Sequence, residues 1–305
     1  MKTDTLQHKA YLTVLRAEHM GMCFGVRDAI TLAKRVVQSR PLTVLGELVH
    51  NDTVLDDLRN RGVRFEAQPD EVETETVMIT AHGASDRAKG HARESGLKLR
   101  DATCPLVHHA HKQVRQLVED GYHPVVIGRR GHVEVRGLTE DLSEHDVVLI
   151  EDDIEALSPR QSYGVVAQTT QPIARVHELV DYLKNRFPAA EVRFVDTVCQ
   201  PTKQRQSAAV ELAKRSDVVL VVGGANSNNT HELAKTCREY CGEVHHVQGP
   251  GDVRSEWLAA SGTLGLTAGT STPDSLIDAV ESRVHELSNC PIPQMPSSRR
   301  WPDLK

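Results

Sequence analysis

The stretch YLTVLRAEHMGMCFGVRDAITLAKRVV, residues 11–37, joins a strand-like run to an amphipathic helix through a turn that carries Cys23. Two further stretches repeat this arrangement: LKLRDATCPLVHHAHKQVRQLVEDG at 97–121 with Cys104, and VRFVDTVCQPTKQRQSAAVELAKRSD at 192–217 with Cys199. These last two also share an Asp three residues before the Cys. The cysteines are roughly 80 and 95 residues apart, which is one small α/β domain per step. The pattern indicates a threefold repeat.

Six further strand-like runs end in polar loops. They are PLTVLGELVHND (41–52), HPVVIGRRGHVEV (123–135), DVVLVVGGANSNNTHEL (217–233), TVMITAHGASD (76–86), YGVVAQTTQPI (163–173) and LGLTAGTSTPD (264–274). Strands alternating with helices predict an α/β fold with mostly parallel sheets, in which ligands bind beyond the carboxyl ends of the strands. We expect three similar units arranged pseudo-threefold around one central cavity. A single polar loop carries little weight, because loops and helix caps are usually polar.

The repeat divides the chain into three expected α/β units and a tail. The units are residues 1–99, 100–190 and 191–288, followed by a Pro- and Ser-containing tail at 289–305 that we expect to be disordered.

Composition excludes several classes of partner. The formal charge is −6 and aromatic residues make up 4% of the chain, so nucleic acid and anionic membranes are disfavoured as partners. The N-terminus MKTDTLQHKAY lacks the apolar core of a secretory signal, and no run approaches the roughly 18 apolar residues of a membrane span. We therefore expect a cytoplasmic protein. No GxGxxG or P-loop pattern supports nucleotide binding.

The three repeated cysteines are candidate metal ligands. Thiolates select zinc, copper(I) or iron–sulfur clusters, and this chain has no CxxC pair of the kind that closes a structural zinc site. A 4Fe–4S cluster ordinarily takes four cysteines, so three indicate a cluster with one open iron. Cys237 and Cys241, spaced i, i+4 on an expected helix, could share a metal, but buried apolar roles are more common for free cysteine. Cys290 lies in the tail.

Nine motifs occur in an order and spacing that resemble the 4-hydroxy-3-methylbut-2-enyl diphosphate reductase (LytB) family. They are GMCFGV, ELVHN, TAHG, DATCPLV, GHVEV, AQTT, DTVCQPT, NSNNT and TAGTSTP, and the resemblance covers roughly residues 12–288. The resemblance implies an enzyme with three α/β units around a central 4Fe–4S cluster. Such an enzyme reduces (E)-4-hydroxy-3-methylbut-2-enyl diphosphate by two electrons and two protons to isopentenyl and dimethylallyl diphosphate, the last step of the non-mevalonate isoprenoid pathway. It also implies a ferredoxin or flavodoxin as electron donor.

The resemblance assigns roles residue by residue. The cluster ligands it implies are Cys23, Cys104 and Cys199; the diphosphate contacts are His50, His82, Ser227, Asn228, Asn229 and Ser271; and the residues around the substrate hydroxyl are His132, Glu134 and Thr169. Hydroxide is a poor leaving group, so a proton must reach it, and Glu134 is the acidic residue of the matched loops suited to deliver it. Thr169 is expected to relay or orient that proton, and His132 to tune the local charge. His108, His109 and His111 are expected to bind no metal, because the family places none there.

Three positions depart from the family pattern. The usual HPEVEG appears here as His132-Val133-Glu134-Val135-Arg136-Gly137, and the usual SSN appears as Ser227-Asn228-Asn229. A cation at Arg136 would favour the charged form of Glu134 and weaken it as an acid. The chain is therefore expected to be a divergent branch.

Two rival hypotheses remain open. One is a non-catalytic or altered-specificity iron–sulfur binding or sensing homologue. The other is a zinc-stabilised α/β binding module.

Overall fold

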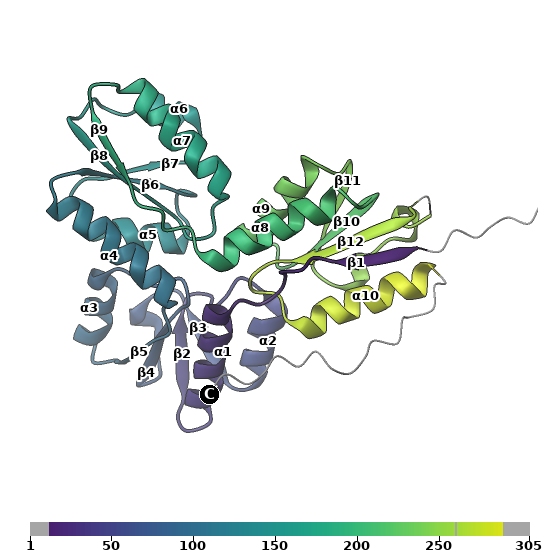
Figure 1. Ribbon diagram of the computed structural model, residues 1–305. Helices are drawn as coiled ribbons and strands as arrows, with labels where there is room; N and C mark the ends of the chain where they lie inside the picture. Colours follow the sequence, from purple (N-terminus) through teal and green to yellow (C-terminus); the bar gives the residue numbers. More distant parts are fainter. Residues whose placement is uncertain (1–11, 260, 289–305) are drawn as a thin grey trace, which may run out of the picture.

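The computed structural model describes residues 12–259 and 261–288 and contains three four-stranded sheets, all of whose strand pairs are parallel. The sheets form three lobes (Figure 1). This confirms the expected α/β fold with mostly parallel sheets. The expected tail at 289–305 and Cys290 lie outside the described residues.

The three sheets have one topology. Sheet 1 has the order β3 (Val63–Glu66), β2 (Leu42–Leu45), β4 (Thr76–Ile79), β5 (Lys98–Asp101). Sheet 2 has the order β7 (Asp146–Val148), β6 (His123–Ile127), β8 (Ser162–Ala167), β9 (Glu191–Phe194). Sheet 3 has the order β11 (Glu243–Val247), β10 (Val218–Val222), β12 (Thr263–Ala268), β1 (Thr13–Arg16). In each sheet the strand that leads into a Cys-bearing turn lies at one edge.

Helices connect the strands. They are α1 (Phe24–Val37), α2 (Asp52–Asn60), α3 (Asp86–Glu94), α4 (Pro105–Glu119), α5 (Val133–Thr139), α6 (Glu151–Glu155), α7 (Ile173–Arg186), α8 (Gln200–Ala213), α9 (Asn228–Arg238) and α10 (Asp274–Ser288), with short 3₁₀ turns at Pro69–Glu71, Pro250–Asp252 and Ser255–Trp257. Among the described residues, no helix combines the length and the apolar character that crossing a membrane requires.

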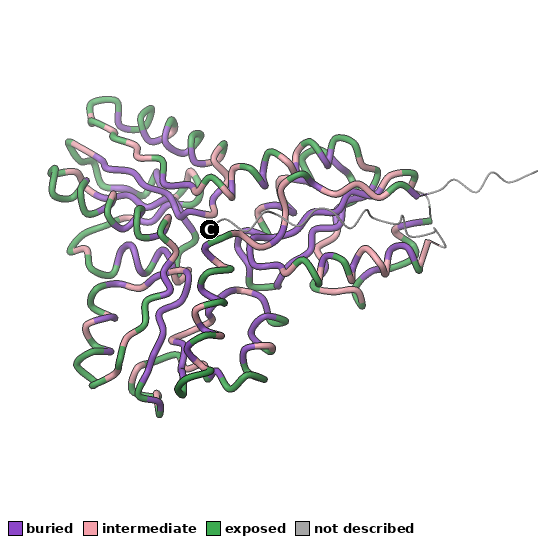
Figure 2. The backbone as a smooth tube through the Cα atoms, turned by 60° about the horizontal axis from the view of Figure 1, so that its bottom comes forward, coloured by how far each residue is buried: buried purple, intermediate pink, exposed green. Residues whose placement is uncertain are grey.

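Burial separates central strands from edge strands. The central strand β10, with the sequence VVLVV, is buried at every residue, as parallel strands covered on both faces must be. In the edge strands β5 (KLRD) and β9 (EVRF) no residue is fully buried: β5 is exposed except at Leu99, and β9 alternates exposed with partly buried residues. Figure 2 shows the same pattern, with buried strands inside and exposed faces on the surrounding helices.

Each Cys-bearing turn carries the chain from one sheet to the next. Strand β1 pairs within sheet 3, but α1 packs into the core of sheet 1. Likewise β5 belongs to sheet 1 while α4 packs on β6 and β8 of sheet 2, and β9 belongs to sheet 2 while α8 packs on sheet 3. The strand pairing therefore differs from the expected unit boundaries near 99/100 and 190/191, since β5 and β9 pair with the preceding unit. The reason is that an edge strand pairs by non-local contacts that its own sequence does not reveal.

Candidate functional site

The three cysteines occupy equivalent positions at the carboxyl ends of the sheets. Cys23, Cys104 and Cys199 are the N-cap residues of α1, α4 and α8. The backbone N–H of each donates to a carbonyl two residues beyond a central strand: Thr270 after β12, Ala81 after β4 and Thr169 after β8, all at 3.0 Å. The same hydrogen bond from the Cys N–H thus recurs in all three units, as a pseudo-threefold arrangement requires.

The recurring Asp of DATC and DTVC has a local structural role. The Oδ1 atom of Asp101 accepts from the Thr103 N–H at 2.9 Å, and Oδ1 of Asp196 accepts from the Val198 N–H at 3.1 Å. Such turns hold the backbone between strand and helix in one conformation. The Asp thus fixes the backbone just before the Cys, which follows three residues after the Asp and caps the next helix.

Two of the cysteine turns are in direct contact. A Cβ atom placed on Gly25 would overlap Cys104 Sγ, so only glycine allows the start of α1 to approach Cys104 this closely. Burial raises the pKa of the Cys104 thiol, and the charges of Cys23 and Glu134 raise it further, while the N–H groups of Leu106 and Val107 lower it. The cysteines are therefore close enough to interact electrostatically.

The same interactions act on the third thiol. Burial raises the pKa of Cys199 to about 11, and the charges of Cys23 and Glu134 add to this, while its bonds with Thr202 lower it. The Sγ atom of Cys199 lies 3.0 Å from the Thr202 hydroxyl. Without a bound cation the thiols of Cys104 and Cys199 are therefore protonated near neutral pH, and a metal centre would displace their protons.

The donor set has the chemistry of an iron–sulfur site, since it consists of three thiols, each at the start of a helix. Within residues 12–259 and 261–288, no three His, Cys, Asp or Glu side chains are close enough together to hold one metal ion. A cluster of several irons and sulfides is larger and spreads its thiolate ligands apart. The start of a helix also favours an anionic group, and each sulfur here lies at one.

Three histidines from two sheets form one cluster beside the cysteines. His50 follows β2, His82 follows β4, and His132 is the N-cap of α5, which follows β6. The ring centroids of His50 and His82 are stacked at 4.3 Å, and His132 lies edge-on at 5.3 Å from His50 and 5.7 Å from His82. Burial, with the charges of His50 and His132, holds the pKa of His82 well below its ordinary value. Burial likewise lowers the pKa of His132 to about 4, with help from the charges of His50, Arg129 and Arg136.

Hydrogen bonds orient two of these rings. The Nδ1 atom of His132 accepts from the Glu134 N–H at 3.1 Å, so a neutral His132 carries its proton on Nε2. The Nδ1 atom of His50 lies 2.8 Å from the Glu47 carboxylate. Sequence reasoning missed Glu47, although a carboxylate three residues before a histidine is a readable signal.

Glu134 is buried beside the cysteines and Thr169. Its side chain lies in the first turn of α5 and is 1% exposed, and Oε1 accepts from the Thr169 N–H at 2.7 Å. Burial raises the pKa of Glu134 to about 7, although the Thr169 N–H and hydroxyl act to lower it. A buried carboxyl group poised near neutral pH is typical of a general acid or base.

The departure at Arg136 does not affect Glu134 as expected. Arg136 is exposed on α5 and has no ion pair with Glu134, and it does not contribute to the shifted pKa of that carboxyl group. Instead its charge lowers the pKa of His132. The expectation that Arg136 would weaken Glu134 is therefore wrong, because the two side chains leave a short helix in different directions.

The loops after β10 and β12 close the other side of the site. Ser227 is the N-cap of α9, and Asn228 and Asn229 begin that helix. The Ser271 hydroxyl donates to the His50 carbonyl at 3.0 Å, and the Asn228 amide donates to the Thr170 hydroxyl at 3.3 Å. A Cβ atom on Gly224 would lie 2.5 Å from that same His50 carbonyl, so the GGAN turn must be glycine there. These contacts join loops of all three sheets.

Several polar atoms of this site are buried without a hydrogen-bond partner among the described residues. They are His50 Nε2, His82 Nδ1 and Asn229 Nδ2. Unpaired buried polar atoms are costly unless a ligand or water satisfies them. Together with the start of α9, they are suited to a phosphate-containing ligand.

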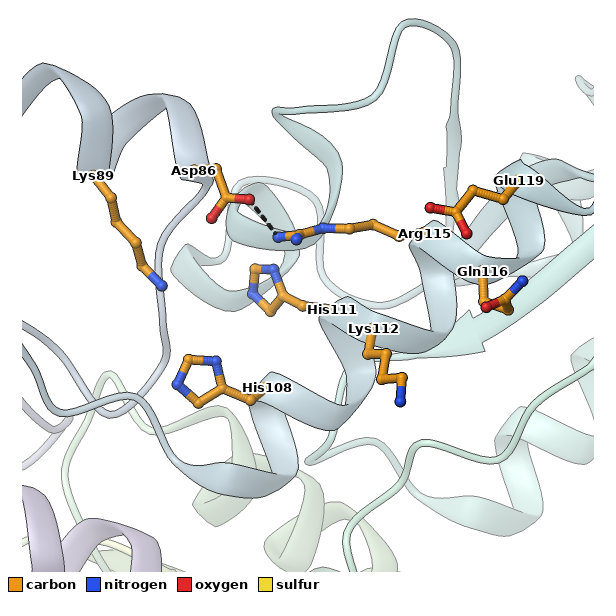
Figure 3. Close-up of a pocket in the computed structure, with 8 residues that line it drawn as sticks. All are labelled: Asp86, Lys89, His108, His111, Lys112, Arg115, Gln116 and Glu119. Atoms are coloured by element: carbon orange, nitrogen blue, oxygen red, sulfur yellow. Dashed lines mark ion pairs between the residues drawn. The ribbon is translucent and has the colours of Figure 1, made fainter.

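The other candidate residues lie elsewhere. Cys237 and Cys241 are buried in the core of sheet 3, where burial raises the pKa of Cys237 to about 12. His108 and His111 line a cavity of about 360 Å³ between α3 and α4 (Figure 3). Lys89, Lys112 and Arg115 line the same cavity, and these cations disfavour a metal there. His109 is exposed on α4.

Comparisons with known proteins agree with this geometry. Residues 14–285 match the LytB protein family. The chain is 37% identical, over 90% of its length and 91% of the relative's, to the 4-hydroxy-3-methylbut-2-enyl diphosphate reductase of Stenotrophomonas maltophilia (strain K279a).

Two solved structures are also similar. The (E)-1-hydroxy-2-methyl-but-2-enyl-4-diphosphate reductase of Plasmodium falciparum has a TM-score of 0.84 and 27% identity, with 90% of this chain and 87% of that chain covered. A structure described as (E)-4-hydroxy-3-methyl-but-2-enyl diphosphate reductase, the terminal enzyme of the non-mevalonate pathway, has a TM-score of 0.65 and 35% identity, with 90% and 99% covered. The chain therefore belongs to the LytB family of 4-hydroxy-3-methylbut-2-enyl diphosphate reductases, which are oxidoreductases of isoprenoid biosynthesis.

Proposed function

We propose that this chain converts (E)-4-hydroxy-3-methylbut-2-enyl diphosphate to isopentenyl and dimethylallyl diphosphate. The carbon–oxygen bond breaks, two electrons and two protons are taken up, and the oxygen leaves as water. The observation that carries the proposal is the position of Glu134, a buried carboxyl group with a pKa raised to about 7 that interacts with Cys104 and Cys199. This position supports a role for Glu134 as the proton donor between the proposed cluster and the proposed diphosphate site.

Cys23, Cys104 and Cys199 would hold one 4Fe–4S cluster. When bound, the cluster supplies the electrons one at a time and, at the iron without a protein thiolate, a Lewis acid. The thiols of Cys104 and Cys199, which burial keeps protonated in the free protein, become ligands by losing those protons. A ferredoxin or flavodoxin is the electron donor that we propose from membership of the family.

The diphosphate would lie against His50, His82 and the loop at the start of α9. His82 Nδ1 and Asn229 Nδ2 are buried polar atoms without a partner in the described part of the chain, and a phosphate oxygen would give each of them one. Ser227, Asn228 and Ser271 shape this end of the site, since Ser271 also fixes the His50 backbone. Few fixed positive charges are needed to bind the diphosphate, because histidine side chains can gain protons when the anion binds.

Glu134 would deliver the proton to the departing oxygen. The Thr169 N–H donates to Oε1, so the acidic proton is carried by the other carboxyl oxygen. Thr169 therefore orients the acid, and its side chain also acts to lower the pKa of the carboxyl group. His132, held by its bond from the Glu134 N–H, presents an Nε2–H donor beside the other two rings.

Anaerobic reconstitution tests the proposal. The purified chain, supplied with iron and sulfide and then with the allylic diphosphate and dithionite, should form both products. A colourless protein with stoichiometric zinc and no sulfide would contradict the proposed cluster. A protein that binds the cluster and leaves the substrate unchanged would contradict the proposed turnover and favour the sensing alternative.

Diphosphate binding should draw protons onto the histidine cluster. The pKa of His82 is low in the free protein, so the ring is neutral at pH 7, and a neighbouring anion raises that pKa. The complex then holds more protons than the free protein, so affinity should increase as the pH falls from 8 to 6. Titration calorimetry in two buffers of different ionisation heat should show net proton uptake. In His82→Asn the uptake should fall, and affinity should drop roughly 10- to 100-fold, the value of one hydrogen bond to a charged group.

The matched control is His109→Asn, which changes an exposed histidine on α4. It should leave both the affinity and the proton uptake unchanged. Equal uptake by the wild type and His82→Asn would remove His82 from the diphosphate site.

A further inference from the structure

Arg205 is a buried cation without a carboxylate partner. The residue lies on α8, six positions after Cys199, and is 8% exposed. Lys89 is equally buried but forms an ion pair with Asp101 at 2.9 Å. No carboxylate within the described ranges lies at ion-pair distance from the Arg205 guanidinium group. A buried charge without a counter-charge is expensive, so its presence calls for an anion.

The guanidinium group instead joins two cysteine turns. Its Nε and Nη2 atoms donate to the Gly21 carbonyl at 2.9 and 2.8 Å, and Nη1 donates to the Pro201 carbonyl at 2.9 Å. Gly21 precedes Cys23 by two residues, and Pro201 follows Cys199 by two. Arg205 thus lies beside two of the three thiols.

The charges that act on Arg205 are those of these same thiols. Burial lowers the pKa of the guanidinium group, while negative charge on Cys23 and Cys199 raises it. Arg27 is the other cation that acts on Arg205, and it is exposed on α1. Gly21 and Pro201, which accept from Arg205, each lie two residues from a proposed cluster ligand, so a cluster bound there would place negative charge beside the guanidinium group.

We propose that Arg205 is a positioning residue that supplies the buried counter-charge of the thiolate-bound cluster and thereby raises its reduction potential. The inference rests on the proposed cluster. Reduction adds one negative charge to the cluster, and a fixed cation in a poorly solvated site favours that charge. Arg27, an exposed cation on α1, should affect the reduction potential less, because water and salt screen its charge.

The test compares four reconstituted proteins: the wild type, Arg205→Gln, Arg205→Lys and Arg27→Gln. Each is titrated anaerobically with dithionite and redox mediators, and the reduced cluster is measured by electron paramagnetic resonance. At the wild-type midpoint, Arg205→Gln should hold roughly tenfold less reduced cluster relative to oxidised cluster, a shift of about 59 mV to lower potential for one electron. Arg205→Lys keeps the charge, so its midpoint potential should remain close to that of the wild type. The midpoint potential of Arg27→Gln should also remain close to that of the wild type.

Each other outcome has a defined meaning. A wild type without iron and sulfide would overturn the proposed function and this inference together. A cluster-containing Arg205→Gln that titrates like the wild type, or an equal shift in Arg27→Gln, would overturn the inference alone. Cluster loss in Arg205→Gln but not in Arg205→Lys would support a role for the charge. Equal loss or an equal shift in both Arg205 variants would overturn it, because the geometry of the guanidinium group would then be the cause.

Discussion

Replacing Glu134 by Gln is expected to slow turnover by about 10²- to 10⁴-fold, the usual contribution of a positioned general acid. The amide has the shape of the protonated carboxyl group and can still accept from the Thr169 N–H through its oxygen. It cannot deliver a proton to the departing oxygen. The iron and sulfide content and the visible spectrum should remain those of the wild type, since Glu134 is not a proposed ligand.

The pH dependence gives this prediction a second measurement. The pKa of Glu134 is raised to about 7 by burial, so the acid form predominates below that pH and is lost above it. In the wild type, kcat measured at saturating substrate, which does not include the pH dependence of binding, should therefore fall as the pH increases above about 7, and the residual kcat of Glu134→Gln should lack that fall. Glu140→Gln is the matched control, because Glu140 lies at the other end of α5, where it bonds to Ser85. Undiminished turnover in Glu134→Gln would remove Glu134 from its proposed role.

Replacing Cys104 by Ala is expected to abolish cluster binding and with it all turnover. A cluster held by three thiolates would keep only two, and the Cys23 and Cys199 turns contain no second cysteine that could replace the lost one. Bound iron and sulfide, measured after anaerobic reconstitution and desalting, should fall to background. Cluster binding stabilises only the folded chain, so the reconstituted wild type should unfold at a higher temperature than its cluster-free form, and Cys104→Ala should show no such difference.

The control for this change is Cys237→Ala, which removes a thiol from the core of sheet 3. Cys237→Ala leaves a small cavity and should lower the free energy of unfolding by about 1 kcal/mol, while keeping the full cluster. If Cys104→Ala bound as much iron and sulfide as the wild type, the three-cysteine cluster would be disproved. A cluster lost from Cys237→Ala as well would point to a general loss of folding.

Local sequence patterns were sufficient to predict the strand–turn–helix repeat and the position of each cysteine at the start of a helix. The run of apolar residues in β10, the polar residues after it and the Asp of DATC all act over a few positions, so they can be recognised in the chain. The threefold pattern of polar strand ends also predicted that distant loops would meet. His50, His82 and His132 do lie in mutual contact.

The tertiary structure alone decided the properties that depend on how the three sheets meet. The pairing of β5 and β9 with the preceding sheet, the burial that raises the pKa of Glu134 and the direction of Arg136 away from it all come from packing between segments far apart in the chain. Arg205 was not recognisable among 36 basic residues, because only the folded chain shows that it is buried beside cysteines and has no carboxylate partner in the described region. The periodicity of the sequence shows which face of a helix or strand is apolar. The desolvation and charge of a side chain such as Glu134 or Arg205 depend instead on which residues of neighbouring elements pack against it.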